Sequence, residues 1–183
     1  MDAKQKKLLE RLKKDDRSAL KELFKEHYKP VCASIYRLVK DKSIVEDLAQ
    51  EVFLRFWNKR HTINVQQSIG AYLRRMAVNE ALGFLRSRKI TESDENIQLE
   101  SQDQDANIEA LVLHSELEDQ IKQAIQNLPP RCKIVFILSR FEDLTYQEIA
   151  NRMEISIKTV ENQMGRALRL LRSQLKDYIS MTR

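Results

Sequence analysis

The stretch LTYQEIANRMEISIKTVENQMGRALRLLR, residues 144–172, contains two helical patterns separated by only three or four residues. The first begins with TYQE, a capping box in which the Thr145 hydroxyl accepts from the Glu148 amide and the Glu148 side chain reaches back. Leu144 and Ile149 stand at the two positions of a hydrophobic staple, which fixes the angle at which the chain enters the helix. We therefore predict a short helix with Thr145 as its N-cap.

A second, longer helix is predicted after the turn. Ser156 is the next favourable N-cap. Beyond it, apolar side chains recur every three or four residues and form one stripe, made of Val160, Met164, Leu168, Leu171 and Leu175. Two helices joined by so tight a turn cross at a steep angle, and the small Ala150 permits close approach, so the pattern predicts a helix-turn-helix. Because Glu154 stands in the turn where such motifs often have Gly, we expect a turn that needs no positive φ angle.

The polar side of the longer helix carries groups that can hydrogen-bond to base edges and neutralise phosphates. They are Lys158, Thr159, Asn162, Gln163, Arg166 and Arg169. A DNA major groove accepts one such helix. For an isolated amphipathic helix, a solvated polar face is the simpler interpretation, but the tight turn, the capping box and the staple together favour DNA recognition. Glu161 could accept from a cytosine amino group or repel phosphate.

Composition excludes several classes of protein. Among 183 residues, 42% are hydrophobic and only three are Gly and three Pro, which favours a mostly helical globular fold. No apolar run approaches the roughly 18 residues of a membrane span, and the N-terminus is too charged for a secretory signal, so we expect a cytoplasmic chain. Cys32 and Cys132 lie in no metal-binding or disulfide pattern. Without a P-loop, a nucleophile elbow or a metal-spaced set of ligands, we expect neither enzymatic activity nor a cofactor.

Charged residues divide the chain into three blocks. Residues 1–90 contain 21 Lys and Arg against 11 Asp and Glu, a net charge of +10. Residues 91–119 contain ten acidic residues and no Lys or Arg, a net charge of −10. Residues 120–183 contain 11 basic and six acidic residues, a net charge of +5. The chain is therefore expected to have two basic parts separated by an acidic one.

The start of the acidic block, TESDENIQLESQDQDANIEA, lacks aromatic residues and regular periodicity. Such a segment cannot offset its ordering entropy by burial. We predict an all-α fold in which two small helical domains, residues 1–90 and 115–183, are joined by a flexible acidic linker at residues 91–114. The charge of this linker could serve solubility alone, or it could imitate nucleic acid against a basic surface.

The first block contains helical patterns over residues 18–39 and 43–57. Pro30 is expected to break or kink the first of these helices, and Ser43 with Glu46 to cap the second. The polar side of the second pattern carries Asp47, Gln50, Glu51 and Arg55, and so includes an acidic cluster. Within a block of net positive charge, such a cluster suggests a docking surface for a basic partner, although a solvated face is at least as common on helices.

The next pattern, residues 68–89, predicts a basic helix. Its polar residues include Arg74, Arg75, Asn79, Arg86, Arg88 and Lys89. Gly83 inside this helix costs about 1 kcal/mol of helix propensity relative to Ala. Trp57, Tyr72 and Phe84 are spaced as core residues, although an aromatic side chain beside a basic groove could also stack on an exposed base.

Two more helices are expected at the start of the second block. The capping box SELE opens the first of them at Ser115, and its apolar face is made of Leu117, Ile121, Ile125 and Leu128. Pro129 ends this helix, and Pro130 can stand in the first turn of the next. We expect these helices to supply the core that holds the helix-turn-helix rigid.

Three segments together resemble the sigma-70 family of RNA polymerase sigma factors, in its extracytoplasmic-function group. DKSIVEDLAQEVFLRFW is similar to the family's polymerase-binding helix, and AYLRRMAVNEALGFLRSRK to its promoter-melting and −10-reading helix. Residues 128–172 are similar to the domain that reads the −35 element. The three segments occur in the family's order and spacing. The resemblance implies a transcription initiation factor that binds core RNA polymerase and directs it to promoters.

The resemblance also implies partners and residue roles. The partners would be the clamp helices of the largest polymerase subunit, the flap of the second-largest subunit, promoter DNA and an anti-sigma factor. Asp47, Gln50 and Glu51 would bind polymerase. Contacts to the −10 element would come from Arg74, Arg75, Asn79, Arg86 and Arg88, and contacts to the −35 element from Lys158, Thr159, Asn162, Gln163 and Arg166. The loop at residues 58–67 would carry a pocket for a flipped base.

Two other functions remain open from the sequence. The helix-turn-helix also resembles the output helices of LuxR-like regulators, which would require a receiver domain with alternating strands. An all-helical adaptor with incidental basic faces would show no sequence-specific DNA binding.

Overall fold

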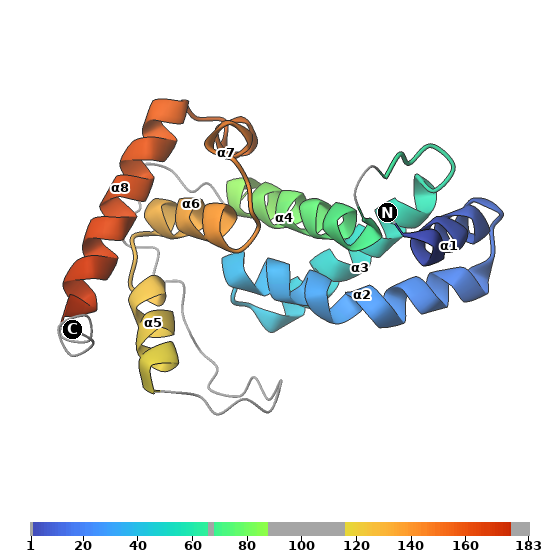
Figure 1. The fold of residues 1–183 in the computed structure, drawn as a ribbon, viewed down its shortest axis with the longest axis horizontal. Helices are drawn as coiled ribbons and strands as arrows, with labels where there is room; N and C mark the ends of the chain where they lie inside the picture. Colours follow the sequence, from blue (N-terminus) through green and yellow to red (C-terminus); the bar gives the residue numbers. More distant parts are fainter. Residues whose placement is uncertain (1, 66–67, 88–115, 177–183) are drawn as a thin grey trace. The chain divides into compact units, whose positions relative to one another are not determined.

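A computed structural model describes residues 2–65, 68–87 and 116–176. Within these ranges the chain forms eight α-helices and no β-strand (Figure 1). It divides into two compact units, Met1–Ile90 and Thr91–Arg183. The prediction of an all-α fold is confirmed, and a receiver domain built on strands has no counterpart in the part of the chain that the structure describes. The predicted acidic linker, residues 91–114, lies outside the described residues.

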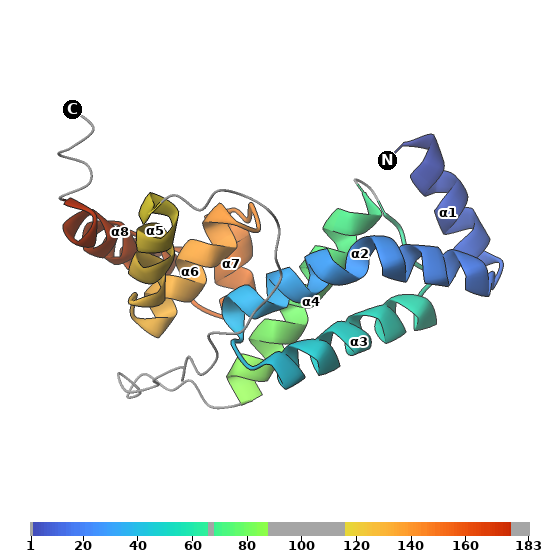
Figure 2. The same cartoon turned by 90° about the horizontal axis from the view of Figure 1, so that it is seen from below.

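The first unit contains α1 (Ala3–Lys13), α2 (Arg17–Leu38), α3 (Lys42–Asn58) and α4 (Ile69–Ser87). Helices α2, α3 and α4 pack against one another, and α1 folds back along the first half of α2 (Figures 1 and 2). Apolar side chains from all four helices are buried, among them Leu12, Leu23, Ile35, Phe56 and Leu73. These contacts form the core of the unit.

The start of α3 differs from the sequence prediction. Asp41, rather than Ser43, is the N-cap, and its carboxylate accepts from the Ile44 amide at 3.1 Å. Ser43 therefore lies inside the first turn. Both residues are good N-caps, so residue preference alone could not choose between two candidates standing two positions apart.

Helix α2 continues through Pro30, so the break that the sequence allowed there does not occur. Proline removes one helical hydrogen bond and costs about 3 kcal/mol or more in a helix interior. Pro30 itself is exposed, while Val31 and Ile35 are fully buried. Burial of this apolar side keeps both halves of α2 on the core, which offsets the lost hydrogen bond.

The second unit contains α5 (Glu116–Gln126), α6 (Pro130–Arg140), α7 (Tyr146–Met153) and α8 (Ile157–Gln174). Pro130 stands in the first turn of α6, as predicted. One buried cluster joins α5, α6 and α8, and consists of Ala124, Leu128, Cys132, Ala167 and Leu171. Ile121, predicted to face inward, is 38% exposed. The inward position on α5 is taken by the smaller Ala124 instead.

Among the described residues, no helix combines the length and apolar character that a bilayer crossing requires.

Candidate nucleic-acid interface

The entry to the helix-turn-helix has the predicted cap. The Thr145 hydroxyl accepts from the Glu148 amide at 3.2 Å, and the Glu148 carboxylate accepts from the Thr145 amide at 2.9 Å. Leu144 and Ile149 are both buried, as a hydrophobic staple requires. The start of α7 is therefore held by polar and apolar contacts that all lie within six residues of sequence.

The turn between α7 and α8 contains a residue with a left-handed backbone conformation. Glu154 has a φ angle of 56° and a ψ angle of 42°, in the left-handed region, so the expectation of a turn without positive φ was wrong. The left-handed residue ends α7, because the amides of Glu154 and Ile155 both turn back to the Ala150 carbonyl. Glu154 is exposed, so its side chain is not packed into the core. The cost of the left-handed conformation is therefore the close approach of its Cβ to its own backbone.

Helix α8 turns a polar face away from the core. Ser156 caps it by accepting from the Thr159 amide at 3.0 Å. Val160, Met164, Ala167 and Leu171 are buried against the unit. The side chains that are exposed on the opposite side include Lys158, Asn162, Arg166 and Arg169. This arrangement brings three of the five residues predicted to read the −35 element onto one accessible face.

The other two predicted readers lie on the flank of α8. Thr159 shares a 2.8 Å hydrogen bond with the Ser156 hydroxyl. Gln163 is half-buried, and its side-chain carbonyl accepts from the Cys132 thiol of α6 at 2.9 Å. Burial raises the pKa of the Cys132 thiol, which keeps the proton that it donates. The amide nitrogen of Gln163 is thus the group that this side chain can offer to a base edge.

One positive charge on the exposed face of α8 is paired with a carboxylate of the same helix. The Lys158 ammonium lies 3.1 Å from the Glu161 carboxylate, and both side chains are largely exposed. An exposed pair of this kind contributes roughly 0 to 1 kcal/mol. Lys158 can therefore exchange Glu161 for a phosphate at little cost.

Helix α4 presents the second predicted face. Arg75, Asn79 and Arg86 are exposed, and their spacing of four and seven residues places them on one side of the helix. Arg74 is also exposed, and its charge acts on His27 of α2. Burial lowers the pKa of His27 on α2; nearby Glu26 opposes this shift, and the positive charge of Arg74 reinforces it. Arg88, also predicted to contact the −10 element, lies outside the described residues.

The Glu80 carboxylate of α4 is neutralised from α3. Glu80 is 16% exposed at its side chain and accepts from Arg55 at 2.9 Å. The same guanidinium donates to Glu51 at 2.6 Å. The bond to Glu51 and the charge of Glu80 raise the pKa of Arg55. Arg55 therefore compensates the Glu80 carboxylate beside Asn79, so the outer side of α4 stays positive.

The acidic cluster forms a surface on α3. Asp47 and Gln50 are exposed, and Glu51 is half-buried beneath Arg55. Their spacing places the three on one face. Leu54 continues this face and is 54% exposed. Sequence reasoning missed Leu54 because it stands among core residues, although its position seven residues after Asp47 was a signal that could have found it.

The segment between α3 and α4 is anchored by Arg60. Its guanidinium lies 4.1 Å from the centre of the Trp57 ring and donates to the Trp57 carbonyl at 2.8 Å. It also donates to the Asp15 carboxylate in the turn before α2. Ile63 and Val65 are buried further along. Residues 59–65, here called the connecting segment, are thus held to the first unit, while residues 66 and 67 lie outside the described part.

Two family models match the two units. The model for sigma-70 region 2 matches residues 23–90, and the model for sigma-70 region 4 matches residues 118–171. The RNA polymerase sigma factor SigV of Bacillus subtilis is 31% identical over 146 residues, which cover 76% of this chain and 83% of that protein. The chain belongs to the sigma-70 family, in its extracytoplasmic-function group.

Other sigma factors match over almost the whole length. The extracytoplasmic-function factor SigW of Bacillus subtilis is 26% identical over 181 residues, covering 94% of this chain and 97% of that protein. The sigma-H factor of Pseudomonas aeruginosa is 27% identical over 169 residues, covering 87% and 88%. As a sigma factor, the chain is a transcription initiation factor and not an enzyme.

Two solved structures share the fold. RpoE of Bartonella quintana, solved with the anti-sigma factor NepR, has a TM-score of 0.53 and 22% identity, over 85% of this chain and 96% of that one. CnrH, solved with the cytosolic domain of CnrY, has a TM-score of 0.54 and 16% identity, over 94% and 97%. In this sigma factor, the acidic face of α3 and the basic face of α4 lie in the region 2 match, and the helix-turn-helix lies in the region 4 match.

Proposed function

We propose that α8 of this sigma factor reads the −35 element in the major groove. The observation that carries the proposal is the exposed row of Lys158, Asn162, Arg166 and Arg169, opposite a buried apolar stripe that fixes the helix on the unit. Arginine and asparagine pair with guanine and adenine edges, respectively. Thr159 and Gln163, on the flank, complete the proposed set by contacting the backbone or an adjacent base.

Helix α4 and the connecting segment act on the −10 element. Arg75, Asn79 and Arg86 line one side of α4 and suit the phosphates and bases of a separated strand. Arg74 and Arg88 extend the proposed set. Because unstacking a base costs a few kcal/mol, the strand must be held once the duplex has opened. A flipped base would be received at the connecting segment, as the family resemblance implies.

The acidic face of α3 docks on core RNA polymerase. Asp47, Gln50 and Glu51 suit a basic partner, and Leu54 supplies an apolar contact beside them. The clamp helices of the largest subunit are the proposed partner of this face, and the flap of the second-largest subunit that of the second unit. The domains are proposed to be residues 1–90 and 115–183, with the linker at residues 91–114. Linked modules gain effective concentration once one of them is bound, so polymerase would bring both to one promoter.

A cytoplasmic location and control by an anti-sigma factor complete the proposal. Two structural relatives were solved with an anti-sigma factor or with a cytosolic domain of another protein. The absence of a spanning helix from the described residues is compatible with this location.

Run-off transcription tests the proposed function. Core polymerase is supplied with DNA from upstream of the gene for this sigma factor, with and without the purified chain. We expect a discrete transcript only when the chain is present, and only when the −35 and −10 elements that the transcript start defines are both intact. Equal transcription with and without the chain would contradict the proposal.

A further inference from the structure

Helix α1 and the turn after it hold both ends of the connection between α3 and α4. We propose that Gln5 and Asp15 form a bracket that positions the connecting segment and the first turn of α4, and that this bracket sets the preference for bases in the −10 element. The inference rests on the proposed function, because it assigns a support to the residues proposed to receive the −10 strand. Gln5 and Asp15 are positioning residues and need not touch DNA.

The first arm of the bracket is Asp15. Its φ angle of 62° is left-handed, a conformation that Asp adopts more readily than most residues with a side chain. In that conformation its carboxylate accepts from the guanidinium of Arg60 and lies 3.4 Å from Nε2 of His61. The Arg60 side chain is only 17% exposed. A guanidinium so enclosed depends on its carboxylate partner, because an unpaired charge would be poorly solvated there.

The second arm is Gln5, 64 residues away from its partner in sequence. Its side-chain carbonyl accepts from the Ile69 amide at 3.3 Å. Ile69 is the first residue of α4 and is fully buried. The Ser68 hydroxyl accepts from the Ala71 amide at 3.1 Å. Two of the four amides that a helix N-terminus leaves unsatisfied are therefore paired, one of them by α1.

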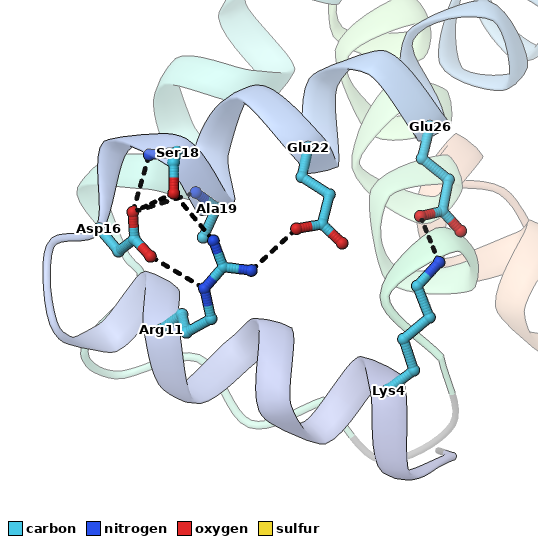
Figure 3. A network of polar contacts seen from close by, with 7 residues as sticks. All are labelled: Lys4, Arg11, Asp16, Ser18, Ala19, Glu22 and Glu26. Carbon is cyan, nitrogen blue, oxygen red and sulfur yellow. Dashed lines mark hydrogen bonds and ion pairs between the residues drawn. The ribbon is translucent and has the colours of Figure 1, made fainter.

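The bracket is itself rigid. Leu8, Leu9 and Leu12 bury one side of α1. Arg11 binds Asp16 at 2.9 Å and Glu22 at 2.8 Å, and its third nitrogen donates to the Ser18 hydroxyl (Figure 3). These contacts hold α1 antiparallel to α2. Gln5 lies in the first turn of α1, and Asp15 lies in the turn that follows its last residue.

The bracket also lies outside the matched family region, which begins at residue 23. Arg60 and Ile69 lie within it. Recognition of a base by hydrogen bonds fails when donor and acceptor move by a few tenths of an ångström beyond about 3.2 Å or lose alignment. Removing the contact of Gln5 or of Asp15 should therefore reduce discrimination among bases at the connecting segment. It should not affect α8 or the acidic face of α3.

Holoenzyme made from core polymerase and the full chain tests the bracket. Initiation is measured on a template pool randomised at the −10 element and on a second pool randomised at the −35 element. For Asp15→Gly, which keeps the left-handed turn but removes the carboxylate, and for Gln5→Ala, we expect discrimination among −10 sequences to fall roughly three- to tenfold, the effect of one or two hydrogen bonds. Discrimination at −35 and affinity for core polymerase should not change.

Matched variants separate positioning from general weakening. Gln5→Glu keeps an acceptor for the Ile69 amide and should restore most of the −10 discrimination, whereas Asp15→Asn keeps an acceptor but not the negative charge beside Arg60 and should restore only part of it. Lys4→Ala removes the 3.6 Å ion pair of α1 with Glu26, which involves neither Gln5 nor Asp15, and should leave the −10 discrimination unchanged. Unchanged −10 preference in Asp15→Gly and Gln5→Ala, or an equal loss at −10 and −35, would overturn the inference. If wild-type holoenzyme does not initiate at all, the proposed function has failed instead.

Discussion

At the scale of single residues, the turn of the helix-turn-helix departs most clearly from expectation. Glu154 supports a left-handed backbone that glycine adopts without a Cβ clash. Glu154→Gly should therefore stabilise the second unit by up to about 1 kcal/mol, since the relief of strain exceeds the entropy that glycine gains on unfolding. Hydrogen exchange of the α7 and α8 amides reports the free energy of opening of this unit alone.

The matched comparison is Glu154→Ala, which removes the side chain beyond the Cβ but keeps the Cβ itself. It should show none of the gain. A gain of equal size in both variants would assign the effect to the lost glutamate side chain and not to the backbone.

Local residues decide how far such details were predictable. Thr145 and Glu148 are three residues apart, and both partners of the capping box are visible in the sequence, so the box was predicted correctly. Asp41 and Ser43 compete for the same helix start, and Gln163 is drawn to one flank by Cys132, 31 residues earlier. The first outcome depends on competition between two nearby N-cap residues, and the second on a contact between two helices. The helix preferences of single residues predict neither.

At the scale of elements, periodicity predicted the buried face of α8, where Val160, Met164 and Leu171 of the expected stripe lie inward, but it misplaced Ile121 on α5. The role of α1 could not be read in this way. The contacts of α1 and of the turn after it to Ile69 and Arg60 span 64 and 45 residues of sequence, and neither partner belongs to a recognisable motif. Leu54 was missed although its spacing of seven residues after Asp47 puts both on one exposed face of α3.

The acidic face of α3 is proposed to dock on core polymerase, and a charge reversal there tests this. Glu51→Arg reverses charge at the centre of the proposed docking surface and should lower affinity for core polymerase at least tenfold, because like charges brought together across an interface cost several kcal/mol. Affinity is measured by titrating labelled chain with core polymerase. Circular dichroism checks that the variant remains helical.

Glu10→Arg is the control, because it makes the same charge change at an exposed position of α1. Core affinity of this variant should match that of the wild type. Equal losses in Glu10→Arg and Glu51→Arg would indicate a long-range charge effect, and an unchanged affinity in Glu51→Arg would remove α3 from the docking surface.

At the scale of the whole molecule, the distribution of charge matters more than the total of +5. Residues 91–114 contain seven acidic and no basic residues. Replacing those seven by Asn and Gln raises the formal charge from +5 to +12. Non-specific binding of DNA is driven by the release of counterions from phosphates. The free chain with residues 91–114 neutralised should therefore bind random duplex DNA more tightly at low salt, and its affinity should fall more steeply as salt rises.

Fluorescence anisotropy with a labelled random duplex, between about 50 and 200 mM salt, measures both effects. A second variant keeps the composition of residues 91–114 but scrambles their order. If net charge is the cause, the scrambled chain should bind as the wild type does. Tighter binding by the scrambled chain would mean that the order of these residues matters, which the imitation of nucleic acid by a specific segment would require. An unchanged affinity in the neutralised chain would show that the linker does not restrain the basic units at all.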